Sequence, residues 1–126
     1  MGQFSTAAQR TVEDFATNVG LDATPAPDGS YGFELSRSGT LSLTPSDSSD
    51  RIIISLARVP YRSDISTERK VLELAGLDLT TTTFVHSGLA QDGNLVLSID
   101  VEEGLFDLAT LDASLRRLIE LHDSIA

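Results

Sequence analysis

Hydrophobic and polar residues alternate most regularly between Asn94 and Glu102. The intervening positions of this run are polar except for Val96, and the apolar ones are Leu95, Leu97, Ile99 and Val101. A period of two indicates a strand with one face on a core and the other in water. The preceding run, Thr81–Ala90, is separated from it by Gln91–Gly93 (QDG). An Asp-Gly pair between two such runs predicts a β-hairpin.

Two segments instead have the alternating three- and four-residue spacing of an amphipathic helix. After Gly104 the stripe consists of Leu108, Leu111, Leu115, Leu118, His122 and Ile125. Near the N-terminus it consists of Phe4, Ala8, Val12, Phe15 and Val19. Thr6 and Gln9 fit a capping box at the start of this first helix, and Gly20 is placed to end it. Each helix is therefore expected to cover one apolar face of a sheet.

Three further strands are predicted between the first helix and Pro60. They are Tyr31–Arg37, Thr40–Thr44 and Arg51–Val59. The last of them is the most β-branched segment of the chain, and apolar residues occupy both of its faces. We therefore expect a central strand that is at least partly covered on each side.

A second helix is predicted over Ile65–Leu77, and its pattern differs from that of the other two. Its apolar residues are Val71, Leu72, Leu74, Ala75 and Leu77. They cover more than half of the circumference, which is more than one buried side requires. Either this helix lies deep in the core or it presents a second apolar face to another subunit. We favour the second interpretation because 126 residues offer little volume to enclose it.

The expected element order is helix, three strands, helix, two strands, helix. This order predicts an α+β fold (α-β-β-β-α-β-β-α) in which helices pack on an antiparallel, twisted sheet. A chain of 126 residues lies within the usual size of one domain, so we expect a single domain over residues 1–126.

Composition narrows the possible partners. The formal net charge is −10 and 40% of the residues are hydrophobic. This charge argues against nucleic acid and against anionic membrane surfaces, and it favours a basic or polar partner. The chain has no cysteine, no secretory pattern and no apolar run long enough to span a membrane. We therefore expect a small cytoplasmic protein.

The sequence carries no recognisable catalytic or cofactor motif. Zinc-hydrolase, serine-hydrolase and nucleotide-binding signatures are all missing. The two histidines, His86 and His122, are better explained as packed or surface residues than as metal ligands. Arg116-Arg117 predicts at most a small basic spot. We expect no enzyme activity, no cofactor, no metal and no small-molecule substrate.

The segment from Lys70 to Ile125 carries a family resemblance. It combines a Leu-rich second helix, a hairpin with Asp-Gly, an apolar strand ending in acids and a closing helix. In this pattern, and in its element order, length and acidity, the chain resembles class I type III secretion chaperones of the Tir-chaperone (CesT-like) family. One departure is Thr80–Thr83, which is more polar than the family pattern.

The resemblance implies a homodimer in the bacterial cytosol that binds the N-terminal segment of a secreted effector. Such a chaperone keeps the segment extended, soluble and export-competent without ATP. The family's dimer contacts map to Val71, Leu72, Leu74, Ala75, Phe84 and Val85. Its effector contacts map to Phe4, Val12, Phe15, Leu41, Leu43 and Ile53. For every one of these residues, packing in the core is the alternative interpretation.

Two other functions stay open at this point. YbjN-like domains are similar in layout and serve as regulatory or sensory interaction modules. A small enzyme with an unrecognised site is the third possibility, and it would require a deep pocket with convergent polar groups.

Overall fold

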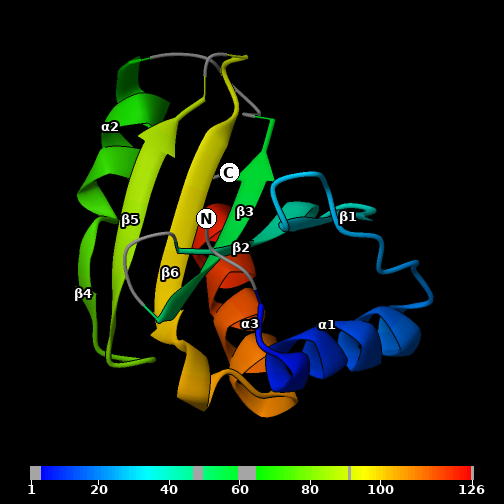
Figure 1. Ribbon diagram of the computed structural model, residues 1–126. Helices are drawn as coiled ribbons and strands as arrows, with labels where there is room; N and C mark the ends of the chain where they lie inside the picture. The colour runs from blue at the N-terminus through cyan, green and yellow to red at the C-terminus, as the bar shows by residue number, and fades with distance from the viewer. Residues whose placement is uncertain (1–3, 47–49, 60–64, 91, 126) are drawn as a thin grey trace.

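The computed structural model describes residues 4–46, 50–59, 65–90 and 92–125 (Figure 1). The helices are α1 (Thr6–Val19), α2 (Ile65–Glu73) and α3 (Leu108–Ser124), and a short 3-10 turn, η1, spans Glu103–Leu105. The strands are β1 (Tyr31–Leu35), β2 (Gly39–Pro45), β3 (Arg51–Arg58), β4 (Gly76–Asp78), β5 (Thr83–Leu89) and β6 (Leu95–Glu102). The α+β prediction is confirmed.

The strands form one antiparallel sheet in the order β1-β2-β3-β6-β5-β4. The predicted hairpin is confirmed, because β5 pairs with β6 and aligns Val85 with Ile99. Gln91 of its turn lies outside the described residues. β3 and β6 are the two central strands of the sheet, and their pairing aligns Ile54 with Ile99, which are 45 positions apart in the sequence. As a result β1 and β4 lie at opposite edges (Figure 1).

The two faces of the sheet differ in what covers them. One face carries the buried alternating residues of β3 and β6, and α1 and α3 pack against it (Figure 1). α2 covers the β5 end of this face, where Val71 and Val85 belong to the same core. On the other face every described residue is half-buried or exposed. The fold therefore has two layers, with helices on one side only.

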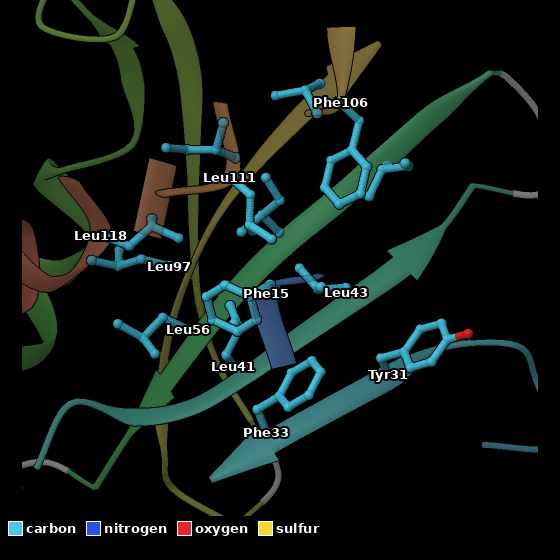
Figure 2. Packing of buried hydrophobic residues seen from close by; sticks show 14 of the residues in the cluster. Phe15, Tyr31, Phe33, Leu41, Leu43, Leu56, Leu97, Phe106, Leu111 and Leu118 are labelled. Carbon is cyan, nitrogen blue, oxygen red and sulfur yellow. The ribbon is translucent and has the colours of Figure 1, made fainter. Parts of the chain in front are cut away.

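Aromatic and branched side chains fill the space between the helices and the sheet (Figure 2). Phe15 of α1 meets Phe33 of β1 edge-on, with ring centroids 5.4 Å apart. Phe4 contacts Tyr31 in the same way, also at 5.4 Å. Leu111 and Leu118 of α3 are fully buried and extend the core along the sheet (Figure 2). The predicted stripes of the first and last helices are thus the faces that the core buries, wholly or in part, except for Val19, which is 43% exposed.

Local details correct two predictions at helix ends. Ser5, rather than Thr6, caps α1, and its side chain accepts a hydrogen bond from the Ala8 amide. Gly20 ends α1 in the left-handed conformation, as predicted. The second helix was predicted to reach Leu77, but it ends at Glu73, and Leu77 lies in β4. The sequence prediction therefore missed one strand and made this helix four residues too long.

The C-terminal end of α3 is fastened to β3. His122 is buried, and its Nε2 lies 2.8 Å from the Leu56 carbonyl oxygen. Arg58 donates to Ser38 O and pairs with the Asp123 carboxylate at 2.7 Å. Burial lowers the pKa of His122, and the nearby Arg58 charge lowers it further, against the opposing effects of the Leu56 hydrogen bond and Asp123. The histidine is therefore a neutral core residue.

Candidate interaction surfaces

The structure divides the predicted dimer residues into two groups. Val71 and Val85 are buried within the single chain, and Leu74 is half-buried. Leu72, Ala75 and Phe84 are exposed. On β5 this difference follows from strand alternation, because consecutive residues point to opposite faces.

The exposed members belong to a larger group at the β4 edge of the sheet, where α2, β4 and β5 lie side by side (Figure 1). We call this group the edge patch, and its residues are Leu72, Leu77, Leu79 and Phe84. Each of them is between 57% and 81% exposed. Leu77 and Phe84 are register partners on neighbouring strands, so their side chains lie together on the helix-free face. Large apolar residues exposed along one edge of a sheet are a candidate interaction site.

The predicted effector contacts are mostly inside the molecule. Phe4, Val12, Phe15, Leu41 and Leu43 are buried in the core. Ile53 is half-buried on the helix-free face. Effector contact by these residues stays a prediction. In the single chain, five of the six pack between the helices and the sheet.

The opposite edge of the sheet is formed by β1. It pairs with β2 from Tyr31↔Leu43 to Leu35↔Gly39, and no described strand pairs with its outer side. An unpaired edge offers backbone donors and acceptors to a further strand. Phe15 of α1 and Phe4, which precedes this helix, pack against the aromatic residues of this strand.

A polar network lies beside the edge patch. Arg117 of α3 donates to Asp78 of β4 through Nη2 and Nε, at 2.9 and 3.1 Å from Oδ1. Thr81 donates its amide and its hydroxyl to Asp78 Oδ2, at 3.1 and 2.8 Å. The Arg117 hydrogen bonds, assisted by those of Thr81, lower the pKa of Asp78 against the effect of burial. This carboxylate is therefore fixed in its charged form.

The helix-free face carries a second charged group. Arg51 pairs with Asp100 at 2.8 Å, and His86 Nε2 lies 3.6 Å from the other oxygen of the same carboxylate. Burial alone would raise the pKa of Asp100, but the hydrogen bond and charge of Arg51 lower it. Across the residues that the structure describes, no three His, Asp or Glu side chains gather in a way that could hold a metal ion.

These surfaces can be compared with those of known proteins. The family model described as "Type III secretory system chaperone SycN" matches residues 8–126. The chain belongs to the SycN family of type III secretion chaperones. Membership confirms the resemblance seen in the sequence, and the match covers nearly all of the chain.

Solved structures of type III secretion proteins share the fold of this SycN-family chain. SycH of Yersinia pestis, solved with a fragment of YscM2, has a TM-score of 0.66 and 14% identity, over 94% of this chain and 99% of that one. A chain of the ExsC–ExsE complex has a TM-score of 0.74 and 15% identity, over 92% and 88%. A chain of the ExoU–SpcU heterodimer of Pseudomonas aeruginosa has a TM-score of 0.62 and 16% identity, over 90% and 93%. Comparison with curated proteins finds no match.

Sequence reasoning missed two members of the edge patch in this SycN-family chain. Leu77 was assigned to the second helix, and Leu79 was not considered. The available signal was Gly76, whose φ of 134° suits glycine and breaks the helical pattern before Leu77. None of the helices in the described ranges is long and apolar enough to cross a membrane.

Proposed function

We propose that this protein is a cytoplasmic homodimeric chaperone that holds the N-terminal segment of a secreted effector extended and export-competent. The observation that carries the proposal is the family match over residues 8–126. Two features of the sheet support it, namely the unpaired strand edge at β1 and the exposed apolar residues at the β4 edge. Among the structures that share the fold, SchA with HopA1 is described as a chaperone–effector complex. No step of this function requires catalysis or ATP.

The edge patch supports self-association. Leu72, Leu77 and Phe84 are large, apolar and more than half exposed on one chain. A second copy related by two-fold symmetry would bring the same surface against itself and bury these side chains. Val71 and Val85, the sequence neighbours of Leu72 and Phe84, belong to the buried core and would anchor α2 and β5 within the protomer.

The β1 edge supports effector binding. An extended client segment can add one more strand there through backbone hydrogen bonds, which are independent of the client's sequence. Its inward side chains would then lie beside the aromatic pairs of Phe15 with Phe33 and Phe4 with Tyr31. The predicted effector residues on α1 would in this arrangement line the contact from within the core. The net charge of −10 favours a basic client.

Co-expression tests the proposal. The tagged protein would be produced with roughly the first 100 residues of each secreted protein encoded beside its gene, a length suited to a segment that orders on binding. We expect one such segment to co-purify, with two chaperone copies per client and no loss on ATP depletion. Absence of capture together with a mass near 13.5 kDa by light scattering would contradict the proposal and would favour a regulatory module.

A further inference from the structure

Two sequence features that have no part in the proposed function meet at one place in the fold. Thr80–Thr83 forms the turn between β4 and β5 and the start of β5, and Arg116-Arg117 lies on α3. Together they line a pocket of about 430 Å³ on the helix-covered side of the sheet. This volume falls within the about 300–1,000 Å³ of ligand pockets.

Buried residues and a hydrogen-bond network form part of the pocket wall. Val101 of β6 and Ser114 of α3 are buried and contribute to its lining. The network of Asp78, Thr81 and Arg117 ties the turn to α3, and the hydroxyls of Thr81 and Thr83 lie 2.6 Å apart. Because these groups already satisfy one another, the pocket keeps its shape without a ligand.

The pocket offers several hydroxyl groups to a ligand. Ser114 is only 4% exposed and contributes to the lining. Thr80 and Thr110 also line the pocket. A hydroxyl can both donate and accept, which matches the amide N–H and C=O groups of a polypeptide. A ligand that supplies hydrogen-bond partners to these hydroxyl groups is therefore favoured.

The charges around the pocket balance. The lining holds two cations, Arg116 and Arg117, and one anion, Glu120, and Asp78 beside it supplies a second anion. Arg117 pairs with both anions, at 2.9 Å from Asp78 and 3.9 Å from Glu120. With no net charge, the pocket does not compensate for removing a charged group from water. An uncharged ligand is therefore favoured over an acidic or a basic one.

We propose that this pocket binds an uncharged polar stretch of extended polypeptide, rich in Ser, Thr, Asn or Gln. The inference rests on the proposed function, in which such a stretch would be supplied by the client. It adds a second contact on the helix-covered side of the sheet, at the end away from β1. The site would select client segments by hydrogen bonding rather than by charge or apolar bulk.

A peptide titration tests the pocket without a client. The probe is the uncharged peptide acetyl-GSNTQSG-amide, followed by amide shifts of the ¹⁵N-labelled protein. We expect saturable shifts at Thr80–Thr83 and around Ser114, with a Kd of about 1–10 mM for so short a ligand. Acidic (GSDTESG) and basic (GSKTRSG) analogues should bind at least about fivefold more weakly, because the pocket must desolvate their charges. Tighter binding of either analogue, or shifts located elsewhere, would overturn the proposal.

Two matched variants separate the pocket from the rest of α3. Ala113 is exposed and lines the pocket, so Ala113→Trp should fill it and abolish the peptide shifts. Ala109 lies one turn before Ala113 on α3; it is exposed and does not line the pocket. A Trp side chain at position 109 would point toward the N-terminus of the helix, away from the pocket, so Ala109→Trp should preserve binding. Equal effects of the two variants would count against the site.

The same variants distinguish this inference from the proposed function. If a client is captured by the unmodified protein, Ala113→Trp should weaken capture about fivefold or more and Ala109→Trp should not. Capture that is unchanged by Ala113→Trp would overturn the pocket and leave the chaperone function intact. Failure of the unmodified protein to capture any client would contradict the function itself.

Discussion

Arg117 of α3 holds Asp78 of β4 by two nitrogen atoms across 39 positions of sequence. The carboxylate side chain is only 10% exposed, and its other oxygen accepts two hydrogen bonds from Thr81. This relationship fastens the last helix to an edge strand of only three residues. The position of β4, and with it the edge patch, therefore depends on a residue of a distant helix.

Removal of the Arg117 side chain should destabilise the fold. Arg117→Ala removes the positive charge that pairs with Asp78, and the Asp78 carboxylate is too buried for water to replace it. We therefore expect the free energy of unfolding to fall by about 2 kcal/mol. Urea unfolding followed by circular dichroism measures this. Arg116→Ala is the matched control, because Arg116 is exposed, and it should change stability by less than about 0.5 kcal/mol. Similar losses in both variants would show that the ion pair does not stabilise the edge.

A charge in the edge patch should separate the proposed dimer without unfolding the protomer. Leu72 is 58% exposed in the single chain, so Leu72→Glu costs little there but places an unpaired charge in a two-fold interface. Sedimentation at micromolar concentration should show a monomer with an unchanged circular dichroism spectrum. Leu105→Glu is the control, because Leu105 is 62% exposed on η1, outside the patch. A dimer that survives Leu72→Glu would argue for a different interface.

Stability should depend on pH through His122. Its native pKa is lowered, so the unfolded state takes up a proton first as the pH falls below the ordinary value of about 6.5. The free energy of unfolding should therefore decrease from about pH 6.5 downward, until the native histidine also becomes protonated. Unfolding midpoints measured between pH 5 and 8 would report this slope. His122→Gln should flatten the slope, and an unchanged slope in this variant would contradict the assignment to His122.

Gly39 should tolerate no side chain. Its φ is 118°, and a Cβ there would collide with the Ala57 carbonyl oxygen of the neighbouring strand. We expect Gly39→Ala to cost about 2–4 kcal/mol, from backbone strain and displacement of β3 together. Gly76→Ala measures the backbone strain alone, because the φ of Gly76 is also positive but a Cβ at this position would meet no other atom. This variant should lower the free energy of unfolding by about 1–2 kcal/mol. Equal costs would mean that the contact with Ala57 is readily relieved.

The sequence by itself determined the elements whose pattern repeats locally. The alternation in Leu95–Val101 identified β6 and its buried face, and the stripes of α1 and α3 identified the residues that enter the core. Gly20 and the Asp-Gly turn marked their boundaries correctly. These features can be predicted from the sequence because a helix or strand in contact with a core repeats its apolar residues with the period of its own backbone.

Only the tertiary structure decided which segments meet. The pairing of β3 with β6, the extra strand β4, and the approach of Arg117 to Asp78 depend on residues dozens of positions apart. It also decided that Phe15 and Leu43 are covered while Leu77 and Leu79 are not. An apolar residue has the same local pattern whether its own chain or a partner covers it, so sequence periodicity cannot separate core from interface.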